Sequence, residues 1–190
     1  MVDSHGEVSA MPQVNRGPEA GLRIQERGVF TFTVRDADGN VTQTAESHNA
    51  LTTVGANQIL DNWRTTTGAT SLYIGLLNGN SSVTLNASDT MASHSGWTEE
   101  DWAATTNYIR QLWNPSGAAA GALTASSATF NLAGLSSGNQ TIAGAFLVDN
   151  DGSSSATAGV LYATSTFTGN STLTLGINDT LTISFSITLS

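Results

Sequence analysis

The residues best suited to chemistry lie between positions 89 and 102, in the stretch Asp-Thr-Met-Ala-Ser-His-Ser-Gly-Trp-Thr-Glu-Glu-Asp-Trp. His94 stands between two serines and is followed by three consecutive acids at 99–101. Groups of these types could act as a serine nucleophile with a histidine base, as metal ligands, or as the carboxylate pair of a glycosidase.

The spacing of these groups fits none of the three chemistries. His94 has no second histidine near it at a ligand spacing, and Ser93 and Ser95 stand in no nucleophile-elbow motif. Acids gathered on one segment are poorly placed to flank a scissile bond. We therefore expect no catalytic residues, no metal site and no cofactor, but a long ordered loop anchored by Trp97 and Trp102 with His94 hydrogen-bonded locally.

Charge is scarce in the second half of the chain. From Trp102 to Ser190 the charged residues are Arg110, Asp149, Asp151 and Asp179. Over the whole chain the charged fraction is 11%, against about 25% in a typical soluble domain. Acid–base catalysis and phosphate binding need such groups close together, so the composition favours a structural or binding role over an enzyme. A weakly charged Ser/Thr/Asn/Gly surface suits a crowded assembly, and equally an extracellular β domain.

The bulk composition also bears on partners and location. A net charge of −9 argues against nucleic acid, whose phosphates are bound by Lys and Arg clusters. No apolar run approaches the roughly 18 residues that span a membrane, so we expect no membrane partner. The start of the chain lacks a secretory pattern, and with no Cys there are no disulfides to indicate a compartment. We expect a soluble protein made in the cytoplasm.

One domain with an extended N-terminal arm is expected. Residues 1–27 hold two of the three prolines and no sustained periodicity, which indicates an extended arm or a frayed terminus. Arg16, Arg23 and Arg27 in this arm would suit an acidic partner surface. Residues 28–190 carry the pattern of a single β-sandwich domain.

One helix and about eight or nine short strands are expected in that domain. Strands are predicted at 29–34, 41–46, 71–77, 108–113, 128–132, 141–148, 160–167, 173–175 and 181–189. The helix is predicted around 55–64, capped by Thr52 or Thr53, with Ile59, Leu60 and Trp63 in the core. The fold class is mainly β, a jelly-roll-like sandwich.

A turn at 36–40, Asp-Ala-Asp-Gly-Asn, joins the first two predicted strands. A calcium loop is the alternative, but an EF-hand has Gly at position 6 and Glu at position 12, whereas here Gly39 is fourth and Ser47 is twelfth. We favour the turn.

Three of the four tryptophans, Trp97, Trp102 and Trp113, lie close together in the sequence. Core packing is expected for Trp113, whereas Trp97 and Trp102 could be core residues or contacts to a partner or a sugar.

Seven motifs follow one another in a distinctive order. They are the turn at 36–40, His-Asn-Ala-Leu-Thr-Thr-Val-Gly at 48–55, Leu-Tyr-Ile-Gly-Leu-Leu at 72–77, Thr-Met-Ala-Ser-His-Ser-Gly-Trp-Thr-Glu at 90–99, Tyr-Ile-Arg-Gln-Leu-Trp at 108–113, Ile-Ala-Gly-Ala-Phe-Leu at 142–147 and Gly-Ile-Asn-Asp-Thr-Leu-Thr-Ile-Ser-Phe at 176–185. This order resembles that of small virion structural proteins of tailed bacteriophages, a group that includes capsid decoration (cement) proteins and tail-fibre attachment domains. No catalytic residues come with the resemblance.

The resemblance implies a non-enzymatic capsid decoration protein on the exterior of the virion. Its expected partners are the major capsid protein and other copies of itself, as a homotrimer. The alternative is a tail-fibre or adhesin-type module that recognises carbohydrate or a host surface through Trp97, Trp102 and the loops near 78–80 and 149–152.

Overall fold

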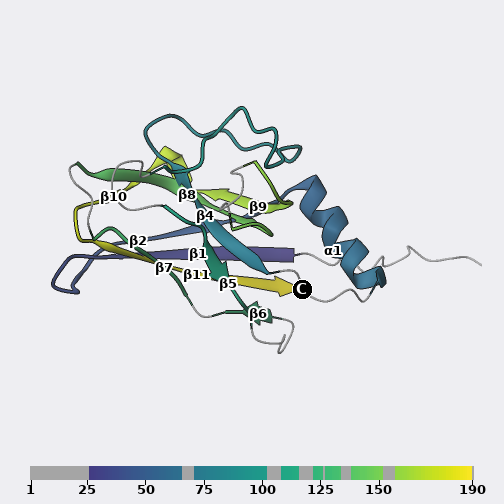
Figure 1. The fold of residues 1–190 in the computed structure, drawn as a ribbon, viewed down its shortest axis with the longest axis horizontal. Coiled ribbons are helices and arrows are strands. Elements are labelled where there is room, and N and C mark those ends of the chain that lie inside the picture. Colours follow the sequence, from purple (N-terminus) through teal and green to yellow (C-terminus); the bar gives the residue numbers. More distant parts are fainter. Residues whose placement is uncertain are drawn as a thin grey trace, which may run out of the picture.

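Two antiparallel sheets lie face to face in the computed structural model (Figure 1). The structure describes residues 26–65, 71–101, 108–115, 122–125, 127–133, 138–151 and 157–189. The expected β-sandwich is therefore confirmed. The predicted arm at 1–27 falls almost wholly outside the described residues, and the first strand begins at Glu26, two residues before the expected start of the domain.

Sheet A holds the first and last strands side by side. Its order is β2-β1-β11-β6, with β7 also paired to β11. The bounds are β1 Glu26–Arg35, β2 Val41–His48, β6 Ala122–Thr124, β7 Ala128–Asn131 and β11 Thr180–Leu189. β1 and β11 pair over their full length, from Glu26 opposite Leu189 to Arg35 opposite Thr180.

Sheet B has the order β3-β9-β8-β4-β5, with β10 also paired to β8. The bounds are β3 Ala50–Leu51, β4 Leu72–Asn78, β5 Gln111–Trp113, β8 Gln140–Val148, β9 Leu161–Thr166 and β10 Leu173–Leu175, and a 3-10 turn, η1, spans Thr168–Asn170. The nine predicted strands all have counterparts. The two extra strands, β3 and β6, have two and three residues and are too short to leave a periodic signal.

The main core fills the space between the sheets. β1 contributes Phe30 and Phe32, and β11 contributes Phe185, whose ring stacks on Phe30 at 4.1 Å between centroids. Trp113 is fully buried, as predicted, and its indole N–H donates to the Phe185 carbonyl at 3.3 Å. Alternate residues of β1 and β11 point into this core because successive strand side chains face opposite sides of a sheet.

Side-chain contacts join the sheets at the β2 edge. The Gln43 amide donates to the Thr174 carbonyl at 2.6 Å and accepts from the Thr174 N–H at 3.2 Å. Nearer the other end of β2, the buried hydroxyls of Ser47 and Ser165 form a hydrogen bond. The amide of Gln43 thus pairs with β10 in the way that a neighbouring strand would.

The turn between β1 and β2 has the predicted form. Asp36 Oδ1 accepts from the backbone N–H groups of Asp38 and Asn40, and Gly39 has a φ of +86°. Hydrogen bonds from Asn40 lower the pKa of the Asp36 carboxyl. Backbone N–H groups of the turn thus donate to this carboxylate, which supports the turn over a calcium loop.

The helix α1, Thr53–Thr65, begins at the predicted cap. The Thr52 hydroxyl accepts from the Gly55 N–H at 3.0 Å, and Gly55 lies so close to β9 that a Cβ there would stand 2.3 Å from the Tyr162 carbonyl oxygen. Gly55 is buried, whereas Ile59, one turn further on, is 36% exposed. The prediction of a core Ile59 was wrong, because helical spacing shows which residues share a face but not how far along that face the packing extends. The side chains of Leu60 and Trp63 lie outside the described residues.

Candidate functional site

Residues 79–101 form a third layer that packs over the outer face of sheet B, on the side away from sheet A (Figure 1), and the layer ends beside β4. There the Asn78 N–H donates to the Thr98 carbonyl and the Glu100 N–H donates to the Leu76 carbonyl, both at 2.9 Å. Met91 and Trp97 from this layer are buried against a second apolar cluster on the sheet. The sheet side of the cluster consists of Leu77, Ala143, Phe146, Val148 and Leu161. The stretch singled out for its chemistry is therefore an ordered layer, as predicted, and not an open loop.

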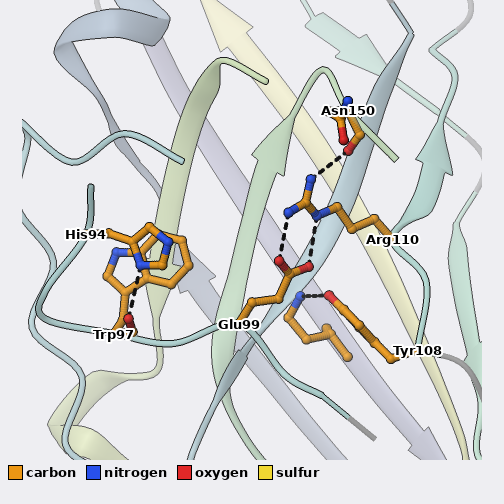
Figure 2. A network of polar contacts seen from close by, with 7 residues as sticks. His94, Trp97, Glu99, Tyr108, Arg110 and Asn150 are labelled. Atoms are coloured by element: carbon orange, nitrogen blue, oxygen red, sulfur yellow. Dashed lines mark hydrogen bonds and ion pairs between the residues drawn. The ribbon is translucent and has the colours of Figure 1, made fainter. Parts of the chain in front are cut away.

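Trp97 is the apolar anchor of the layer. It is 3% exposed, and its indole N–H donates to Asp89 Oδ2 at 3.0 Å. The His94 ring stacks on the indole at 3.7 Å, and His94 Nδ1 lies 3.1 Å from the Trp97 carbonyl oxygen (Figure 2). The predicted local hydrogen bond of His94 is thus confirmed, and it ties His94 to Trp97.

A bidentate ion pair fastens the end of the layer. Arg110 Nε and Nη2 donate to the two carboxylate oxygens of Glu99 at 2.8 and 2.7 Å, and Nη1 donates to the Asn150 carbonyl at 3.0 Å (Figure 2). The guanidinium lies 5.4 Å from the centre of the Phe146 ring. The Arg110 side chain is 1% exposed and that of Glu99 is 13% exposed. Arg110 therefore links the layer, the chain entering β5 and the loop after β8.

Tyr108 extends the same network towards β4. Its hydroxyl oxygen accepts from the Leu76 N–H at 2.7 Å (Figure 2). Burial, and then the charge of Glu99, raise the pKa of the phenol well above its usual value of 10.0. The hydroxyl thus stays protonated at physiological pH and remains a neutral hydrogen-bonding group.

Glu100 is a buried carboxyl beside this network. It is 2% exposed, accepts from Asn78 Nδ2 at 3.0 Å, and accepts from the Asp101 N–H at 3.3 Å. Burial raises its pKa from 4.5 to about 7. The nearby Arg110 is paired with Glu99. Among the described residues, the hydrogen-bond donors to Glu100 are therefore two neutral groups, the Asn78 amide and the Asp101 N–H, and none is basic.

These contacts hold the outer layer against sheet B. One guanidinium binds both carboxylate oxygens of Glu99, and His94 forms its hydrogen bond with a backbone carbonyl. In the ranges that the structure describes, no three His, Asp or Glu side chains gather in a way that could hold a metal ion. The absence of catalysis stays a prediction from the sequence.

The outer face of sheet A is a second candidate surface. Across β2, β1, β11 and β7, a row of threonines lies in register: Thr44, Thr33, Thr182 and Thr129. The next row runs from Glu46 through Thr31 to Ser184, whose hydroxyl lies 2.9 Å from that of Ser127. Neighbouring strands are about 4.8 Å apart, so the hydroxyls form a regular array.

The predicted contact residues have different outcomes. Arg16, Arg23 and Trp102 lie outside the described residues, and for Arg27 only the backbone is described, within β1. Trp97 was open to two interpretations, and its burial favours core packing over a surface contact.

The Glu99–Arg110 pair was missed at the sequence level. One signal for it was present, because Arg110 is the one charged residue between Trp102 and Asp149 and stands in the mainly apolar stretch Tyr-Ile-Arg-Gln-Leu-Trp, shortly after the acids at 99–101. A lone arginine in such a pattern indicates a buried ion pair.

Comparisons with known protein families, curated proteins and solved structures gave no match. In the part of the chain that is described, no helix has the length and apolarity needed to cross a membrane.

Proposed function

We propose that the protein is a non-enzymatic structural component of a tailed-bacteriophage virion, a capsid decoration protein that binds and stabilises the outside of the head. The observation that carries the proposal is the outer face of sheet A, where hydroxyl side chains stand in register across four strands. The motif order noted in the sequence supplies the class of partner.

The chemistry of this face suits attachment to a protein lattice. Thr33 and Thr182 lie at its centre, opposite each other on the two middle strands. Hydroxyls both donate and accept hydrogen bonds, so they can pair with backbone and amide groups of a partner without the desolvation cost of charges. With no Lys in the chain, the face has few long charged side chains that would have to be ordered on binding.

Many weak contacts of this kind become strong when copies are linked. A homotrimer would present three such faces, and the effective concentration of the second and third contacts would raise the total affinity far above that of one. Arg16, Arg23 and Arg27 would add contacts to an acidic capsid surface.

The test is co-sedimentation with capsids assembled from the major capsid protein of the same genome. The wild type should bind, and the double variant Thr33→Arg with Thr182→Arg should lose binding because two bulky charges stand in the middle of the face. Asn57→Arg with Ser95→Arg, at exposed positions on helix α1 and the outer layer, is the matched control and should bind normally.

Two outcomes would overturn the proposal. One is a folded wild-type protein that fails to bind capsids, and the other is normal binding by the double arginine variant. Deleting residues 1–25, which spares β1, should weaken attachment and leave the domain folded; full binding by the truncated protein would remove the arm from the mechanism. Light scattering tests the expected trimer directly.

Carbohydrate recognition through Trp97 has little support, because the indole is 3% exposed and covered by His94. A sugar site would have to be built from other residues.

A further inference from the structure

A hollow of about 250 Å³ lies where the start of the outer layer meets the connection between β9 and β10. Residues 79–83 form one wall, and Thr166, Ser171 and Thr172 form the other, with Ala143 of β8 between them. The hollow is separate from the Glu99–Arg110 network and from the outer face of sheet A.

Backbone hydrogen bonds hold the first wall in place. The Gly79 N–H donates to the Thr141 carbonyl at 2.6 Å, and the Asn80 N–H donates to Asn78 Oδ1 at 2.8 Å. A Cβ at position 79 would stand 2.8 Å from the Thr141 carbonyl oxygen, so this close approach requires glycine.

The second wall is held in the same way. The Phe167 N–H donates to the Ala143 carbonyl at 3.0 Å, and the Ser171 hydroxyl donates to the Thr168 carbonyl at 2.9 Å. Since both walls are fixed, a ligand would meet a largely pre-formed site, which lowers the entropy lost on binding.

The lining has an apolar part and a polar rim. Ala143, 7% exposed, the buried Phe167 and the half-buried Val83 supply the apolar part. The rim carries exposed side chains that make no hydrogen bond to any described residue: Asn80, Ser81, Ser82 and Thr172. Amide and hydroxyl groups each offer a donor and an acceptor, so the rim can bind hydroxyls in either sense.

Charge and size narrow the ligand class. Among the described residues, no charged side chain lines the hollow, and the net charge of −9 disfavours anions nearby. The volume is below the range of roughly 300–1,000 Å³ typical of pockets for drug-sized ligands. A neutral ligand with one apolar face and several hydroxyls, of the size of a single ring, matches these limits.

We propose that this hollow is a binding site for one neutral pyranose sugar, whose C–H face lies over Ala143 and Val83 and whose hydroxyls bind Asn80 and Thr172. The proposal does not depend on capsid decoration. The dissociation constant is on the order of millimolar, because a ligand of about a dozen heavy atoms makes few contacts.

The experiment is saturation-transfer NMR on the full chain with glucose, galactose, mannose and N-acetylglucosamine, each titrated separately. At least one neutral sugar should receive saturation from the protein. Glucuronate should bind more weakly than glucose because it is anionic. The double variant Asn80→Ala with Thr172→Ala should weaken the binding about tenfold, since it removes two of the rim partners.

The control is Asn57→Ala, an exposed asparagine on helix α1, which should bind as the wild type does. Melting curves of both variants confirm that they are folded. The proposal is overturned if none of the four sugars receives saturation at about 50 mM, a concentration well above the expected constant. It is also overturned if the double variant binds as tightly as the wild type, which would put the sugar elsewhere.

Discussion

Glu100→Gln removes the charge of the buried carboxyl and keeps its shape. The glutamine oxygen can still accept the Asn78 Nδ2 hydrogen bond that Glu100 accepts at 3.0 Å. The replaced group has a pKa of about 7 in the folded protein, against 4.5 in an exposed chain. The variant therefore tests whether burial governs the stability of this part of the molecule.

The pH dependence has a definite sign. Between pH 4.5 and 7 the unfolded chain releases this proton while the folded protein keeps it, so the free energy of unfolding falls as pH rises through this window. The shift corresponds to at most about 3 kcal/mol, and to about 1–3 kcal/mol once water near the exposed Asp101 screens part of the charge. Below pH 4.5, where Glu100 is protonated in both the folded and the unfolded chain, the stabilities of the wild type and the variant should differ only through the exchange of an acid for an amide.

Urea unfolding followed by tryptophan fluorescence gives the comparison, at about pH 5 and about pH 8.5. Relative to the wild type, Glu100→Gln should gain about 1–3 kcal/mol on going from the lower to the higher pH. Any lost hydrogen bond to the Asp101 N–H lowers the stability equally at both pH values and cancels. Glu46→Gln, an exposed carboxylate on β2, controls for removal of one negative charge. If the difference between Glu100→Gln and the wild type is the same at both pH values, the reasoning is refuted.

Three further predictions concern other contacts and use the same unfolding assay. Arg110→Met should lower the free energy of unfolding by about 3–5 kcal/mol because it leaves the Glu99 carboxylate buried without its partner, and adding Glu99→Gln should recover part of the loss. Strictly additive effects of the two substitutions would contradict a coupled pair. Thr52→Ala should cost about 1–2 kcal/mol through loss of the helix cap, whereas Thr52→Ser should keep most of it, and equal losses would count against capping. Gly55→Ala should destabilise the protein because the new Cβ would meet the Tyr162 carbonyl, even though alanine favours a helix by about 1 kcal/mol over glycine. The control is Asn57→Ala, at an exposed helix position, which should not destabilise. A stabilising effect of Gly55→Ala would show that the contact with Tyr162 is loose.

Local patterns predicted most of the elements of this fold. The alternation in β11 places Leu181, Ile183 and Phe185 in the core, and the turn chemistry at 36–40 marks the first hairpin. Both signals are local, since side-chain direction and turn type depend on residues only a few positions apart.

The errors and omissions arise where distant segments meet. Ile59 is exposed, whereas Gly55, one turn before it, meets β9 in a contact that spans more than a hundred positions of the sequence. The bonds of Arg110 to Glu99 and to the Asn150 carbonyl likewise depend on how three segments meet over sheet B. Periodicity carries no information on which segments are neighbours, so the fastening of the outer layer could not be derived from it.

The pairing of β1 with β11 has a consequence for how the molecule folds. The hairpins β1–β2 and β8–β9 join strands that are near in sequence, whereas Glu26 meets Leu189 only after the intervening chain has been brought round. Closing so long a loop costs conformational entropy before the contacts in the middle of sheet A offset it, and chains dominated by such distant contacts fold slowly. The two hairpins can therefore form early, and the hydroxylated face of sheet A is complete only when β11 docks between β1 and β7. A surface that depends on this final step is presented by the folded protein alone, so partly folded chains would not compete for the same partner.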